Sequence, residues 1–171
     1  MDISRKTDYA LRMLSMLASN ENPLLSVRAA AESGDVPYSF ARSIQHSLAQ
    51  AGIIESLRGV HGGMRLKVDA KTITLREVVE AVQGPIVTNS CAAADGVCPR
   101  AGNCCYHPIW VGTQELLRNY LDSVTLYDVV HGVKFPSVDS KFADPSRFVE
   151  YVGCNSTSSC HASVREDAVS A

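Results

Sequence analysis

The sequence has no apolar run long enough to span a bilayer and no signal-peptide-like apolar segment near its first residue. We therefore expect no membrane association and a cytoplasmic location, where cysteine thiols stay reduced. An excess of one charge is also missing, since the 171 residues carry a net charge of −2. This balance argues against a chain that coats nucleic acid through bulk positive charge. What the chain does have is a hydrophobic fraction of 46%, which is typical of a globular core.

The sequence contains few of the residue patterns that are typical of an enzyme active site. Cys104 and His107 resemble a nucleophile and a base, but no acid, phosphate-binding loop or pocket-forming pattern accompanies them. We therefore expect no enzymatic activity.

Cysteine is concentrated in one short stretch, the cysteine loop from Cys91 to His107, which reads CAAADGVCPRAGNCCYH. Six residues separate Cys91 from Cys98 and five separate Cys98 from Cys104, so the paired spacing of a zinc finger is missing. The intervening residues are small or turn-forming, which is typical of a loop that wraps around a central object. Soft thiolates on such a loop suit an iron–sulfur cluster, which accepts sulfur at several points and tolerates long gaps. Structural zinc, a disulfide pair and cysteines without any ligand role are the alternatives.

Before this loop, the apolar pattern predicts three helices. The first covers residues 3–19, where Asp8 and Arg12 lie one turn apart, at the spacing of a surface ion pair. Ser26 is a good N-cap for a short second helix. A third helix runs from about Tyr38 to Gln50, with an expected inner face of Phe40, Ile44, Leu48 and Ala51. Two short helices joined by a turn at Gly34–Pro37 predict a helix-turn-helix, or less specifically a helical hairpin with a polar outer face.

The third helix and the segment after it carry the candidate DNA contacts. Residues 53–57 and 64–68 are expected to form a β-hairpin around the glycine-rich turn RGVHGG, which makes the unit a winged helix. Residues 38–68 contain four Lys/Arg and one Glu, a local basic patch that suits double-stranded DNA. The candidate contacts on the helix are Tyr38, Arg42, Gln45 and His46, and those on the wing are Arg58, His61 and Arg65.

The second half of the chain predicts further helices and a tail. Thr74 caps a helix LREVVEAVQ, and a long amphipathic helix over residues 109–124 has an apolar stripe that a second copy of the chain would bury. Packing within its own chain is the alternative. The expected fold is mainly α with a small β-hairpin: a winged helix-turn-helix plus a long dimerisation helix. The expected parts are a DNA-binding domain (1–84), a cluster-binding loop (85–108), a dimerisation helix (109–131) and a loosely ordered tail (132–171).

These features together resemble the IscR/NsrR-type transcription regulators of the Rrf-two family. The resemblance covers about residues 1–131 and rests on TDYALR, the helix-turn-helix, RGVHGG, ITLREVVEAVQGPI, three spaced cysteines and IWVGTQELLRNYLDSVTLYDV. It implies a homodimer on palindromic promoter DNA, and a 2Fe–2S or 4Fe–4S cluster bound at Cys91, Cys98 and Cys104. Such regulators sense redox state, nitric oxide, iron or cluster status.

The family offers two choices of fourth ligand. His107 matches the histidine of the iron–sulfur-biogenesis branch, and Asp8 matches the aspartate that the nitric-oxide branch takes from the first helix of the partner subunit. The six-residue match TDYALR favours Asp8, while the gap between Cys91 and Cys98 is one residue longer than in either branch. The alternative function is a cluster-free winged-helix regulator that responds through thiol oxidation or a small metabolite.

Overall fold

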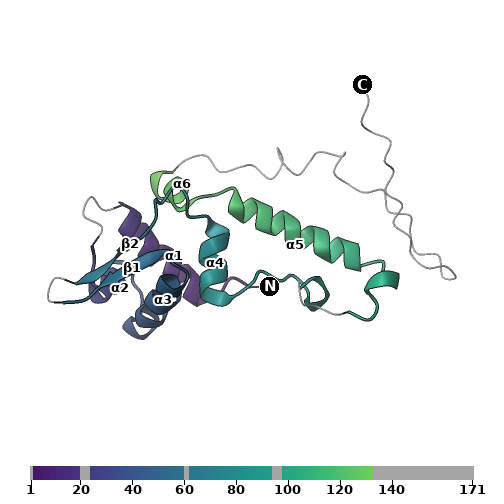
Figure 1. The fold of residues 1–171 in the computed structure, drawn as a ribbon, viewed down its shortest axis with the longest axis horizontal. Helices are drawn as coiled ribbons and strands as arrows, with labels where there is room; N and C mark the ends of the chain where they lie inside the picture. Colours follow the sequence, from purple (N-terminus) through teal and green to yellow (C-terminus); the bar gives the residue numbers. More distant parts are fainter. Residues whose placement is uncertain (1, 20–23, 60–61, 94–97, 133–171) are drawn as a thin grey trace, which may run out of the picture. The chain divides into compact units, whose positions relative to one another are not determined.

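The computed structural model describes residues 2–19, 24–59, 62–93 and 98–132, which are mainly helical with one two-stranded hairpin (Figure 1). The described residues fall into two compact units. The DNA-side unit contains the residues up to 86 and those from 117 onward, and the cysteine-loop unit contains 87–116. The tail expected over 132–171 lies, apart from its first residue, outside the described residues. No helix in the described part is long and apolar enough to cross a membrane.

Helices α1 (Arg5–Ser19) and α2 (Val27–Ser33) form where the sequence predicts them. Ala10, Met13, Leu14 and Leu17 share one face of α1 and are buried in the core. Ser26 caps α2, because its hydroxyl accepts a hydrogen bond of 3.1 Å from the backbone N–H of Ala29.

Helix α3 (Tyr38–Gln50) has the predicted bounds, but part of its predicted inner face is wrong. Ala41, Ile44 and Leu48 are the buried positions, since they share one face at spacings of three and four residues. Phe40 is 43% exposed and packs its ring edge-on to Tyr9 at a centroid distance of 5.5 Å. Ala51 lies beyond the last helical residue and is exposed.

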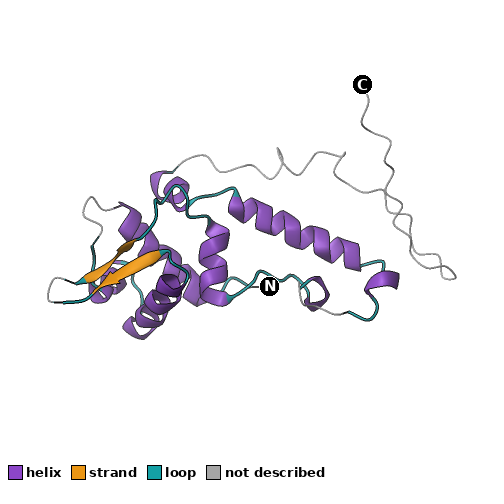
Figure 2. Ribbon diagram, viewed as in Figure 1, coloured by secondary structure: helices purple, strands orange, loops and turns teal. Residues whose placement is uncertain are grey.

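The predicted wing is present as strands β1 (Ile54–Leu57) and β2 (Gly63–Leu66), drawn in orange in Figure 2. They pair antiparallel, with Ile54 opposite Leu66 and Ser56 opposite Met64. Backbone hydrogen bonds between Leu25 and Met64, of 2.8 and 3.0 Å, fasten the hairpin to the residues before α2. The order of α1, α2, α3 and the hairpin confirms the predicted winged helix-turn-helix.

Helix α4 (Leu75–Gln83) begins at Thr74, as predicted, and Glu77 completes a capping box with Thr74 that the sequence reading did not identify. The helix ends at Gly84, whose φ of 89° lies in the region that favours glycine. Helix α6 (Leu126–His131) begins beside it, because Leu126 donates a backbone hydrogen bond of 2.8 Å to Ile73.

The long helix α5 (His107–Asp122) begins and ends two residues before its predicted bounds. Arg76 of α4 donates a hydrogen bond of 2.7 Å to Asp122 near the carboxyl end of α5. This hydrogen bond raises the pKa of the Arg76 guanidinium above its ordinary value. Glu80 adds a second link, because it lies 3.7 Å from the Nε of Arg118. The carboxyl end of α5 is therefore tied to α4 by charged pairs.

Candidate DNA-reading surface and cysteine loop

The candidate DNA-reading surface, called the DNA-reading surface below, consists of the outer face of α3 together with the wing. Burial of Ala41, Ile44 and Leu48 turns the other side of α3 outward, where Arg42 and His46 are exposed. Tyr38, in the first turn of α3, is 48% exposed. The predicted α3 contacts therefore share one accessible side of the helix. Arg58, the residue after β1, is exposed as well.

Arg28 of α2 joins this surface, which the sequence analysis did not identify. Its guanidinium lies 5.3 Å from the centre of the Tyr38 ring, a cation–π contact between the two helices of the helix-turn-helix. Arg28 is exposed, so its guanidinium can also contact an anion. The signal in the sequence was a basic residue on the first helix of the motif, the helix that crosses the DNA backbone in such folds.

Two of the predicted DNA contacts are held by side chains of β1. Gln45 donates a hydrogen bond of 3.0 Å from its Nε2 to the hydroxyl of Ser56. Arg65 pairs with Glu55, the residue directly opposite it across the hairpin. Arg65 is therefore partly neutralised in the free protein, whereas no charged pair is found for Arg58 among the described residues. His61 lies outside the described residues.

The cysteine loop presents three thiols. Cys91, Cys98 and Cys104 are free of disulfides and each is half-buried. Cys91 lies in a 3-10 turn (Ser90–Ala92), and Cys104 directly follows a second one (Ala101–Asn103). Hydrogen bonds within such short turns fix the local backbone, although the loop has no hydrophobic core of its own.

Gln114 of α5 anchors the start of this loop, and its side chain is only 5% exposed. Its Nε2 donates a hydrogen bond of 2.8 Å to the carbonyl of Ala92, and its Oε1 accepts one of 3.3 Å from the N–H of Thr88. The hydroxyl of Thr88 donates to the carbonyl of Trp110 at 3.2 Å. The residue next to Cys91 is thus fixed to α5.

We expect Gln114→Ala to loosen this part of the loop, because the buried Ala92 carbonyl and the Thr88 N–H both lose a partner. A lost buried hydrogen bond costs about 1–3 kcal/mol, so hydrogen exchange at residues 88–92 should become about 5–150-fold faster. Hydrogen exchange followed by mass spectrometry measures this. Thr113→Ala is the matched control, since the Thr113 hydroxyl bonds only within α5, to Ile109, in the described structure. Equal exchange in the two variants would show that Gln114 is not the anchor.

The side chains of the cysteine loop are chemically suited to bind a thiophilic metal or an iron–sulfur cluster. Three free thiols occur on one loop, and the Nδ1 of His107 is buried without a hydrogen-bond partner in the described part of the chain. The described positions do not complete a site, since no three His, Cys, Asp or Glu among the described residues gather to hold one metal ion. Binding three thiolates to one centre therefore requires the loop to close further.

The other candidate ligand, Asp8, belongs to the DNA-side unit. Its carboxylate lies 2.9 Å from the guanidinium of Arg12, which confirms the ion pair predicted from their spacing. Both side chains are about half exposed, so the pair contributes little to stability.

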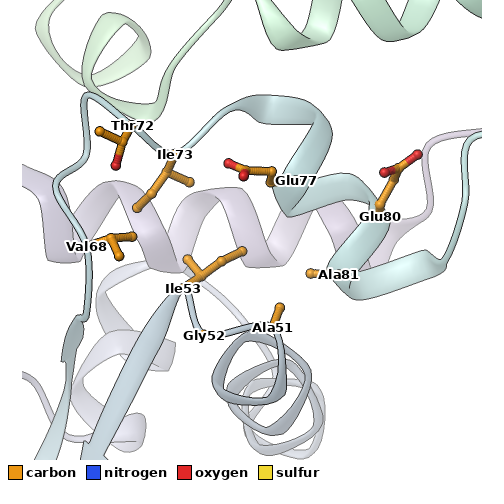
Figure 3. Close-up of a pocket in the computed structure, with 9 residues that line it drawn as sticks. All are labelled: Ala51, Gly52, Ile53, Val68, Thr72, Ile73, Glu77, Glu80 and Ala81. Atoms are coloured by element: carbon orange, nitrogen blue, oxygen red, sulfur yellow. The ribbon is translucent and has the colours of Figure 1, made fainter.

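A hollow of about 500 Å³ lies in the DNA-side unit, where the end of α3 meets α4 (Figure 3). Ile53 and Ile73 give it an apolar surface, and Glu77 and Glu80 of α4 line it as well. Both carboxylates are already engaged, Glu77 in its capping box and Glu80 with Arg76 and the backbone N–H of Ile86. The hollow thus offers mainly apolar contact.

Comparison with known proteins identifies the family. The Rrf2 family, described as an iron-dependent transcriptional regulator, matches residues 3–132. The chain is 31% identical to protein aau3 of Rhizobium meliloti, over 77% of this chain and 80% of that protein. It is 26% identical to the transcriptional regulator IscR of Klebsiella pneumoniae, over 82% of this chain and 86% of that protein.

A solved structure shares the fold. CymR, the global cysteine regulator of B. subtilis, matches with a TM-score of 0.62 at 22% identity, over 78% of this chain and 99% of that one. The resemblance predicted from TDYALR, the wing and the cysteine spacing is confirmed at the level of the family. The chain belongs to the Rrf2 family of DNA-binding transcriptional regulators.

Proposed function

We propose that this regulator binds palindromic promoter DNA as a homodimer, and that an iron–sulfur cluster held by Cys91, Cys98 and Cys104 controls the binding. The observation that carries the proposal is the set of three free, half-buried thiols on one loop of an Rrf2 regulator. The iron dependence by which the Rrf2 family is described, and the similarity to IscR, support the same assignment.

The cluster, when bound, supplies a redox- and nitric-oxide-reactive centre whose loss releases the thiols. The chain contributes the rest. Its thiols must be deprotonated to act as ligands, so thiol oxidation and acidification both oppose binding. Gln114 of α5 is hydrogen-bonded to Ala92, the residue next to Cys91. A movement of the loop that closes it around a cluster would therefore act on α5.

One charged pair, one neutral hydrogen bond and the apolar core offer a path from α5 to the DNA-reading surface. Arg76 and Asp122 connect α5 to α4, and Thr7 of α1 donates a hydrogen bond of 2.8 Å to Gln83 at the end of α4. Helix α1 packs against α3 through the common core. A coupling of about 1–3 kcal/mol along this path changes DNA affinity about 5–150-fold.

For the fourth ligand, the described contacts favour His107 over the Asp8 expected from the TDYALR match. The Nδ1 of His107 is buried without a hydrogen-bond partner among the described residues, and His107 is separated from Cys104 by only two residues. Asp8 must first give up its 2.9 Å contact with Arg12.

A second candidate is a cluster-free regulator that responds to thiol oxidation or to a small metabolite. The fold likeness to CymR and the apolar hollow beside α4 support it. The absorption spectrum of the protein purified without oxygen separates the two, because only the cluster protein absorbs in the visible region.

The DNA-binding half of the proposal is tested by Arg42→Ala and Arg58→Ala. An arginine that contacts a phosphate contributes about 0.9 to the salt slope of binding, so losing it weakens all sequences alike and flattens that slope by about one. An arginine that reads a base instead costs about 1–3 kcal/mol at one base pair. Fluorescence anisotropy at several salt concentrations measures both effects.

Arg100→Ala is the control, since it removes the same charge from an exposed position in the cysteine loop. If Arg42→Ala and Arg58→Ala behave like Arg100→Ala, in both affinity and salt slope, the DNA-reading surface is assigned wrongly.

A further inference from the structure

The side chains of Gln45 and Ser56 form a contact that no sequence motif predicts. Gln45 lies on the outward side of α3, and Ser56 lies on β1, eleven residues later. The Gln45 Nε2 donates to the Ser56 hydroxyl at 3.0 Å, at an accessible place on the surface. The contact links the candidate reading helix to the first strand of the wing.

This hydrogen bond determines which groups of the Gln45 amide remain available. A glutamine amide carries two N–H donors on its nitrogen and an acceptor oxygen. Ser56 uses one N–H, which leaves the second N–H and the oxygen. In the major groove, adenine presents an acceptor at N7 beside a donor at N6. The remaining pair on Gln45 is complementary to that pattern.

The opposite orientation of the amide would present different chemistry. If the Ser56 hydroxyl donated to the amide oxygen, the nitrogen would offer two donors to the base. Two donors suit the paired acceptors N7 and O6 of guanine. With the nitrogen held on Ser56, a single N–H remains beside the amide oxygen, and that oxygen would face the acceptor O6 of guanine, so this orientation favours adenine over guanine.

Ser56 is well placed to hold the amide still. Its backbone is paired with Met64, which is 1% exposed and is itself fastened to Leu25. A free glutamine side chain samples several rotamers, and ordering it on binding costs affinity. A hydroxyl on a fixed strand removes part of that cost before DNA arrives.

We propose that Ser56 is a positioning residue that orients Gln45 for reading adenine at one base pair of the target site. Ser56 itself need not touch the base. The inference rests on the proposed binding of promoter DNA, with α3 placed in the major groove. It adds a preferred base and a residue outside α3, Ser56, that determines this preference.

The test compares Ser56→Ala, Ser56→Thr and Gln45→Ala on a site selected from random DNA, with each base pair changed in turn. For the unmodified protein, replacing the adenine opposite Gln45 should weaken binding about 5–150-fold, and Gln45→Ala should abolish this penalty. Ser56→Ala should reduce the penalty about 2–10-fold at that base pair alone, with an unchanged salt slope. Ser56→Thr keeps the hydroxyl on a strand-compatible residue and should restore the penalty.

The outcomes are distinguishable. A uniform loss of affinity in Ser56→Ala, or no change in base preference, would overturn the role of Ser56. A preference for guanine lost in Gln45→Ala would overturn the orientation of the amide. Failure of the unmodified protein to select any DNA would instead overturn the proposed function.

Discussion

Replacing Cys98 with alanine is expected to abolish the visible absorption of the anaerobically purified protein and its signal-dependent DNA binding. Cys98 is the middle one of three free thiols, so its loss leaves two donors at opposite ends of the loop. Two thiolates cannot hold a cluster that needs three or four protein ligands, and the freed loop no longer transmits a constraint to α5. The loss should be nearly complete rather than graded. Absorption spectroscopy and anisotropy titration on one sample measure both effects.

Ser90→Ala is the matched control, because it removes a side-chain hydroxyl beside Cys91 without removing a thiol. It should keep the spectrum of the unmodified protein. A normal spectrum and normal signal response in Cys98→Ala would end the cluster proposal. His107→Ala and Asp8→Ala extend the comparison, since the fourth ligand is the one whose loss shifts the absorption bands.

Replacing Leu116 with aspartate is expected to raise the dimer dissociation constant at least about a hundredfold. Ile109 and Leu116, seven residues apart on one face of α5, are 49% and 45% exposed in the isolated chain. Burying one leucine contributes about 1.5–3 kcal/mol, and a two-fold interface buries it twice. The substitution removes that contribution and places a carboxylate in the interface. Sedimentation analysis at micromolar concentration measures the change.

Glu115→Ala is the control, because this exposed neighbour lies outside the Ile109–Leu116 stripe on α5. Thermal unfolding of both variants verifies that the winged helix is intact. Affinity for a palindromic site should fall in Leu116→Asp while affinity for a half-site is retained. An unmodified protein that is monomeric, or a Leu116→Asp variant that is dimeric, contradicts the assignment of α5.

Local chemistry explains which features of the fold could be predicted. The capped starts of α2 and α4 and the Asp8–Arg12 pair all depend on residues within four positions of each other. The exposure of Phe40 was missed because its aromatic contact is with Tyr9, on another helix. Helical periodicity predicts which face of a helix is apolar. It does not predict which residues at the margin of that face are buried in the core.

The missed site residues share a different cause. Gln114 reaches Ala92 across 22 positions, and Gln45 reaches Ser56 across eleven. Such contacts follow from tertiary packing, and polar residues at these positions carry no periodic signal. The thiols were predictable because their chemistry is specific, whereas the way the loop is anchored was not.

Cluster control of DNA binding is tested most directly by comparing two binding curves on one DNA fragment selected by the protein. One curve uses the anaerobically purified protein, and the other uses the same preparation after its iron has been removed by a chelator under reducing conditions. Cluster control predicts saturable, salt-dependent binding in the first case and an affinity that differs about 5–150-fold in the second. Superimposable curves would contradict cluster control of DNA binding.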